Sequence, residues 1–162
     1  MSTLATVKRT AVLAAAVAAL YFTPGLMPMA MAQPAVLAPA ITEVANITPT
    51  EQAAIAAFVA ANKAGLTGDV DQVKAARAAI LRPLNNARVT TQFRQAYSAE
   101  LKPVLEPLVA DNRDFVAVNA LRIAGELATS STVPMLLSQL GAGAKDRPLS
   151  VRYGACFGAA RM

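Results

Sequence analysis

The sequence predicts an all-α fold, a short stack of antiparallel helical hairpins. The first observation is the segment 114–129, whose apolar residues recur at helical spacing on two faces. One face holds Val116, Ala120, Ile123, Ala124 and Leu127, and the other holds Ala117, Leu121 and Ala128. A helix of this kind must pack against neighbours on two sides. The other observations are that the pattern recurs near the end of the chain and that helix-start and helix-stop residues punctuate the chain from residue 48 onward.

The start of the chain, 1–32, has the pattern of a secretory signal peptide. Lys8 and Arg9 precede an apolar run over 11–22, and Ala30-Met31-Ala32 places small residues where a signal peptidase cleaves. A membrane-spanning helix, the alternative, needs about 20 continuous apolar residues. The run is interrupted by Pro24, Gly25 and Pro28. We therefore predict cleavage after Ala32 and export to the periplasm or the extracellular space, with a membrane tether only if 1–32 is retained.

A Pro- and Ala-rich flexible leader is predicted over 33–47, followed by a divergent N-terminal helical cap over 48–101. The first helix of the cap begins with a capping box, in which Thr48 and Glu51 bond each other's backbone and Pro49 takes the first helical position. Gly65 is expected to end this helix in the left-handed conformation.

The second helix of the cap is predicted to start at Asp69 and to stop at Pro83. A third helix is expected to start near Arg88, with Phe93 and Tyr97 on its buried face. Because a proline inside a helix removes a backbone bond at a cost of about 3 kcal/mol, Pro103 and Pro107 predict a break or kink at Lys102-Pro103, with a short helix running on to Ala110.

The segment 102–162 is predicted to form two further hairpins, because its halves resemble each other. Residues 103–109 match 134–140, and the longer loop 141–148 absorbs the difference in length. The second helices match at four pairs of positions, which are Val116 and Val151, Ala120 and Ala155, Ala124 and Ala159, and Leu127 and Met162. Self-similarity of this kind is typical of helical-hairpin repeats.

Helix ends are expected at particular residues of these hairpins. Asp114 and Thr132 are expected to cap the helices that follow them, and Gly141 to end the second of these helices. The last helix is predicted to run from Leu149 to the end of the chain. Within it, Gly154 and Gly158 would permit close approach of a neighbouring helix.

These residues resemble HEAT repeats. The resemblance covers about 102–162 and rests on a proline near the start of each first helix, on Val151-Arg152 at the start of the last helix and on small residues where helices approach. The chain departs from the family's pattern at Ala117, where arginine is usual. The resemblance implies a right-handed stack of hairpins, a HEAT-like α-solenoid that is truncated at its C-terminal end. An ordinary helical bundle is the alternative.

The composition argues against catalysis and against nucleic acid as a partner. The chain has no histidine, which excludes most catalytic triads and zinc sites. Its single cysteine, Cys156, is expected to be buried and inert. We therefore predict no enzyme activity, no cofactor and no metal. Loss of 1–32 would leave 13 basic against 10 acidic side chains, a net charge of +3, without a basic run.

The leading hypothesis for function is a non-catalytic scaffold that binds a protein partner. The binding face is predicted at Asn119, Arg122, Glu126 and Arg152, of which the first three form an exposed polar strip on the central helix. Ordinary solvated surface arginines are the alternative. A second hypothesis is an accessory helical domain of a larger enzyme or complex, whose active part lies beyond Met162. The last helix is expected to expose Phe157, Ala159 and Met162, which leaves self-association open.

Overall fold

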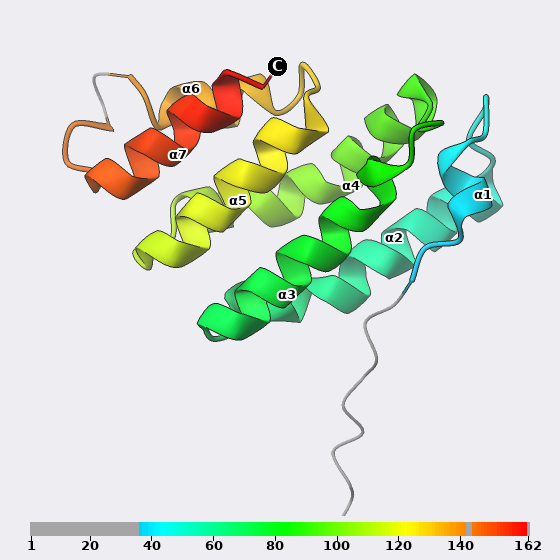
Figure 1. The fold of residues 1–162 in the computed structure, drawn as a ribbon, viewed down its shortest axis with the longest axis horizontal. Helices are drawn as coiled ribbons and strands as arrows, with labels where there is room; N and C mark the ends of the chain where they lie inside the picture. Colours follow the sequence, from blue (N-terminus) through cyan, green and yellow to red (C-terminus); the bar gives the residue numbers. More distant parts are fainter. Residues whose placement is uncertain (1–35, 142–143, 162) are drawn as a thin grey trace, which may run out of the picture. The chain divides into compact units, whose positions relative to one another are not determined.

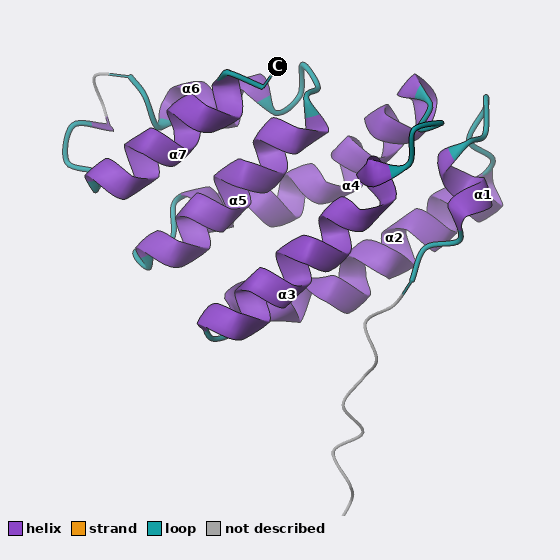
Figure 2. Ribbon diagram, in the orientation of Figure 1, coloured by secondary structure: helices purple, strands orange, loops and turns teal. Residues whose placement is uncertain are grey.

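The computed structural model describes residues 36–141 and 144–161. This part of the chain contains helices and loops but no strand (Figure 2), so the all-α prediction is confirmed. The predicted signal peptide and residues 33–35 of the predicted leader lie outside the described residues. The helices are α1 (Pro39–Thr42), α2 (Pro49–Lys63), α3 (Val70–Leu81), α4 (Thr91–Val109), α5 (Asp114–Leu127), α6 (Val133–Ser138) and α7 (Leu149–Ala159), with 3₁₀ turns η1 (Ala64–Thr67) and η2 (Arg82–Asn85).

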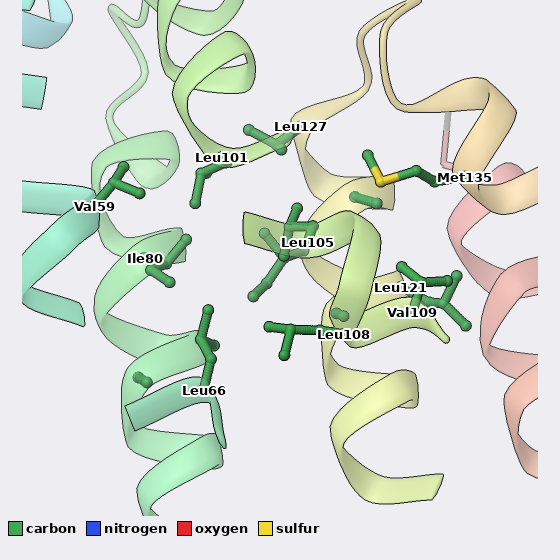
Figure 3. Packing of buried hydrophobic residues seen from close by; sticks show 14 of the residues in the cluster. Val59, Leu66, Ile80, Leu101, Leu105, Leu108, Val109, Leu121, Leu127 and Met135 are labelled. Carbon is green, nitrogen blue, oxygen red and sulfur yellow. The ribbon is translucent and has the colours of Figure 1, made fainter. Parts of the chain in front are cut away.

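The helices pack as consecutive pairs. Helices α3, α5 and α7 lie side by side, while α4 packs against both α2 and α5, and α6 packs against α5 and α7 (Figure 1). One apolar core runs between them (Figure 3), with contributions from α2 (Val59), α3 (Ile80), α4 (Leu101 and Leu105) and α5 (Leu121). Helix α5 is the most enclosed, as its two apolar faces predict.

The predicted starts of α2 and α3 are confirmed. The Thr48 N–H donates to Glu51 Oε2 at 2.7 Å, and the Glu51 N–H donates to Thr48 Oγ1 at 3.4 Å. At α3, Asp69 Oδ1 accepts from the N–H of Gln72 at 2.8 Å. The expected left-handed cap at Gly65 is wrong, because the chain continues from α2 directly into η1. A Cβ at Gly65 would lie 2.9 Å from Ala76 Cβ, so glycine is needed there for close packing.

Helix α4 overturns the expected break after Lys102. It runs unbroken through Pro103 and Pro107, across the boundary at 101/102 between the predicted cap and hairpins. Both prolines and Ala99, four residues before Pro103, are exposed. The carbonyls of Ala99 and Pro103, which lose their helical donors, therefore lie on the solvent side. The buried side of the helix keeps its apolar contacts, which favour a continuous helix.

The start of α4 also differs from the prediction. The helix begins at Thr91, and Thr90 caps it by accepting from the Phe93 N–H at 3.2 Å. The expected core position of Phe93 and Tyr97 is confirmed, since both are fully buried and their rings stack at 5.3 Å. Tyr97 Oη donates to the Ile80 carbonyl at 2.8 Å, and burial raises the pKa of the phenol.

The expected cap at Asp114 is wrong. Asp114 is the first residue of α5, and no side chain caps this helix. Asp111 instead organises the turn before it, since its Oδ1 accepts from the Arg113 N–H at 2.8 Å. Hydrogen bonds from Arg113 hold the pKa of Asp111 below its ordinary value.

The end of α5 is satisfied from another helix. Ala128 takes the left-handed conformation, with φ 50°. Arg94 of α4 donates to the carbonyls of Glu126 at 2.9 Å and Leu127 at 3.3 Å. A cation at this position binds carbonyls that have no helical donor and favourably meets the negative end of the helix dipole.

The matched positions of the two predicted hairpins have similar burial at two of the three described pairs, since Ala124 is buried but Ala159 is only partly buried. Val116 and Val151 are both buried, and so are Ala120 and Ala155. The predicted start of the last helix at Leu149 is confirmed, although the helix ends at Ala159.

Three expectations about this part of the chain are wrong. Thr132 precedes α6 but its hydroxyl donates back to the Thr129 carbonyl, so it does not cap the helix. Helix α6 ends at Ser138, before Gly141. Its C-cap residue is Gln139, whose N–H already donates to carbonyls of the last turn. Cys156 is exposed, because it lies on the side of α7 away from α5.

The described part of the predicted leader, 36–47, packs on the helices. Leu37 and Thr42 are buried. Asn86 Nδ2 donates to Thr42 Oγ1 at 2.8 Å, and the Thr90 hydroxyl donates to the Val44 carbonyl at 2.7 Å. These bonds hold the segment against η2 and the start of α4.

Candidate functional site

A basic groove runs over the row formed by α3, α5 and α7. It consists of three hollows of about 420, 330 and 380 Å³ that share lining residues. Arg77 lines all three, Arg122 lines the first two, and Glu126 and Arg161 line the last two. The charged residues of the groove are Lys74, Arg77, Arg94, Arg122, Arg161, Asp114 and Glu126.

The centre of the groove is an anchored arginine. Arg77 Nη1 of α3 donates to Asn119 Oδ1 of α5. Asn119 is itself held, because its Nδ2 donates to the Phe115 carbonyl at 2.6 Å. The amide is only 8% exposed. The prediction that Asn119 belongs to an exposed strip is therefore wrong, because α3 packs beside α5 at this point and covers it.

Arg122 lies close enough to Arg77 for their charges to interact. Burial, and then the positive charge of Arg122, lower the pKa of the Arg77 guanidinium. Arg122 is exposed, and no ion pair of Arg122 is found among the described residues. Two guanidinium groups, one held by Asn119 and one without an ion pair, therefore face the same hollow, whose lining also includes the carboxylate of Asp114.

Both acidic side chains of the groove already have a partner within the chain. Glu126 pairs with Arg161 at 2.7 Å, and Asp114 Oδ2 accepts from the Ser150 hydroxyl at 2.8 Å. Arg94 is also occupied, by the carbonyls at the end of α5. The groove thus has an excess of positive charge, concentrated at Arg77 and Arg122.

The fourth predicted site residue, Arg152, does not line these hollows. Ser150 faces the groove, and two residues of an α-helix turn the side chain by about 200°. Arg152 therefore points to the other side of α7. The structure brings Arg122 and Glu126 together but leaves Arg152 apart. The set of site residues predicted from the sequence omits Arg77. A signal that could have found it is Lys74, three residues earlier on the outer side of α3, because the two basic residues lie on the same face of a helix.

The groove contains no catalytic constellation that we recognise. Within 36–141 and 144–161, no group of three His, Cys, Asp or Glu side chains could hold a metal ion. None of the helices in these ranges is long and apolar enough to cross a membrane. No family model, no curated protein and no solved structure matches the chain. The charged side chains that line the groove are mostly guanidinium groups.

Proposed function

We propose that the chain is a non-catalytic interaction module that binds an acidic segment of a protein partner in the basic groove. The observation that carries this proposal is the pair Arg77 and Arg122, which face one hollow and form no ion pair among the described residues. A carboxylate placed between them would relieve their repulsion. It would also accept charge-assisted hydrogen bonds, for which the planar guanidinium is well suited.

Preorganisation supports the same proposal. Ordering a long side chain upon binding costs about 0.5–1.5 kcal/mol. Arg77 has already met part of this cost, because Asn119 holds its guanidinium before any partner arrives. The groove is open to solvent, where salt screens the attraction between charges. We therefore expect the affinity for the acidic segment to fall as ionic strength rises.

The arrangement of the helices agrees with a HEAT-like stack. In such repeats the second helices of successive hairpins form an extended binding surface. Here α3, α5 and α7 lie side by side and carry the basic groove. The equal burial of Val116 and Val151 supports the correspondence between the last two hairpins.

Export remains part of the proposal. The basic pair, the apolar run and the small residues before Gln33 support cleavage after Ala32. N-terminal sequencing of the protein from the exported fraction tests this. A mature start at Gln33 is expected, and a retained Met1 in the membrane fraction would favour the tethered alternative.

The groove is tested with labelled peptides. Fluorescence anisotropy is measured for a Glu-rich peptide and for a Lys-rich peptide of equal length. The double variant R77E/R122E should weaken binding of the Glu-rich peptide by at least about tenfold, because repulsion replaces attraction. R152E is the matched control for the single variant R122E, since it makes the same charge change on an exposed arginine outside the groove, and should weaken binding by less than about twofold.

Two outcomes would overturn this proposal. One is the absence of any preference for the Glu-rich over the Lys-rich peptide. The other is an equal loss of affinity for each reversed arginine, which would indicate only a diffuse positive field. Melting temperatures of all variants are measured alongside, so that unfolding is not mistaken for lost binding.

An accessory helical domain of a larger enzyme or complex is the second candidate. Large apolar side chains of the last hairpin are exposed, with Leu149 at 77%, Tyr153 at 71% and Phe157 at 50%. Exposed apolar surface of this kind is typical of contact sites. A coding sequence that continues past Met162 would favour this candidate. Light scattering at micromolar concentration tests the simpler alternative, in which the face joins two copies of the chain.

A further inference from the structure

A separate hollow lies between the segment 36–42, α2 and α3. Its volume is about 360 Å³, which is within the range of roughly 300–1,000 Å³ found for small-molecule sites. Neither Arg77 nor Arg122 lines it. We call it the apolar pocket, because most of its lining side chains are aliphatic or aromatic.

Small side chains create the pocket. Ala75, Ala78 and Ala79 lie on one side of α3 and supply only methyl groups to its wall. Opposite them stand Leu37 and Phe58, which are almost fully buried. The hydrogen bonds that tie 36–47 to Asn86 and Thr90 fix the outer wall, so the segment does not collapse onto the alanines.

One end of the apolar pocket is polar, and the charged side chain at that end is Arg82. Thr42 Oγ1 donates to the Pro39 carbonyl at 2.7 Å and accepts from Asn86 Nδ2, so both side chains are satisfied. Arg82, one helical turn beyond Ala78, is exposed and has no ion pair among the described residues.

No carboxylate of the described residues lines the pocket. The nearest acid bonded to its rim is Glu43, which accepts from Asn86 Nδ2 at 3.0 Å and faces Arg88 at 3.7 Å. The charge of Glu43 is thus partly compensated by Arg88, while the charge of Arg82 is not compensated. An anionic group at the polar end therefore meets an attractive field.

We propose that the apolar pocket binds a monocarboxylic acid with an alkyl chain, such as a medium-chain fatty acid. The alkyl chain lies against the three alanines and Phe58, where burial removes its methylene groups from water. The carboxylate lies at Arg82, which can donate two parallel N–H bonds to it. The pocket shares Ala78 with one hollow of the basic groove, but Ala79 and Arg82 do not line that groove, and neither proposal needs the other.

Isothermal titration calorimetry of the full chain with decanoate, below its micelle-forming concentration, tests the proposal. Saturable binding with one site per chain is expected. A79L fills the pocket with a residue that helices accept well, and should lower the affinity at least about tenfold. A57L is the matched control, since it makes the same change on the exposed side of α2 and should bind as the unaltered chain does.

A second pair of measurements tests the role of Arg82. R82Q should weaken decanoate binding several-fold and leave the binding of decanol, which carries no charge, unchanged. Decanoate binding that survives A79L, or an equal affinity for decanol and decanoate in the unaltered chain, would overturn the proposal. So would the absence of saturable binding. The Glu-rich peptide should bind A79L and R82Q normally, which separates this site from the basic groove.

Discussion

Helix α5 has two neighbours in its row, and it meets them in opposite ways. On the α7 side the contact is between backbones, since a Cβ on Gly125 would lie 2.5 Å from Gly158 Cα and 2.9 Å from Gly158 O. On the α3 side a long side chain, Arg77, reaches to Asn119, and hollows remain above the contact. Helix α5 therefore packs closely against α7, whereas its contact with α3 leaves hollows at the surface.

The difference shows how side-chain size decides where a binding surface forms. Glycine and alanine allow helices to approach until no ligand can enter between them. Arginine and asparagine satisfy each other instead and leave the helices further apart at the surface. Close packing is thus concentrated on the α7 side of α5, whereas the proposed binding surface lies on the α3 side. Substitutions on the two sides should consequently have different effects.

The largest effect is expected for G125A. The added methyl group meets the backbone of Gly158, which cannot rotate away, so α5 and α7 must separate. Overpacking of this kind costs about 1–3 kcal/mol, and we expect the upper end of that range. Urea unfolding followed by circular dichroism measures the loss.

The matched control for G125A is G154A. A Cβ there would lie 3.6 Å from Val118 Cγ1, an ordinary contact. Alanine also favours the helix over glycine by up to about 1 kcal/mol, so this variant should be unchanged or slightly more stable. If G154A destabilised the chain as much as G125A, close backbone contact would not be the reason for the glycines.

G158A should have an intermediate effect. Its Cβ would lie 2.8 Å from Leu136 Cδ2, which can move, and 3.1 Å from the Leu121 carbonyl, which cannot. A cost of about 1–2 kcal/mol is expected. G158A should cost less in an L136A background than in the unaltered chain if the leucine methyl is the main obstacle, and the comparison is made against L136A alone because that change itself removes a buried side chain. An equal cost of G158A in both backgrounds would assign it to the backbone of α5.

On the open side, N119A should cost less, about 1 kcal/mol, since it removes one hydrogen bond to a guanidinium that can turn to solvent. Its characteristic effect is on binding. Without Asn119, Arg77 loses its fixed position, so affinity for the Glu-rich peptide should fall several-fold although the groove keeps its charge. Peptide anisotropy and urea unfolding on the same sample check both parts. Full affinity in a folded N119A would show that preorganisation of Arg77 does not matter.

The helices were predictable where a local rule acts alone. The capping boxes at Thr48 and Asp69 depend on residues three apart, and the buried faces of α4 and α5 depend on helical spacing. The prolines of α4 were not predictable in this way. Their cost depends on which side of the helix faces solvent, and only the packing of α4 against α2 and α5 decides that. The C-terminal end of α5 could not be predicted for a similar reason, because Arg94, which binds the carbonyls there, comes from another helix.

The candidate site was less predictable than the fold. Arg122 could be identified because it stands alone in an apolar helix. Asn119 looks equally exposed in sequence, yet it is buried through its contact with Arg77, which comes from a helix more than 40 positions earlier. Arg152 follows the repeat pattern but lies on the other side of its helix from the groove. Tertiary contacts between helices decided each of these cases.

The smallest expected effect concerns the repulsion between Arg77 and Arg122. If the two guanidinium groups disfavour each other, R122Q should raise the free energy of unfolding by a few tenths of a kcal/mol at low salt. The gain should vanish at about 1 M salt, where the Debye length falls to about 3 Å. R152Q is the control, because it removes the same charge outside the groove and should show no salt-dependent gain. Urea unfolding of both variants at two ionic strengths supplies the comparison. A gain of equal size for R152Q would mean that the net charge of the chain, and not the arginine pair, is responsible, and the basic groove would lose its distinction from the rest of the surface.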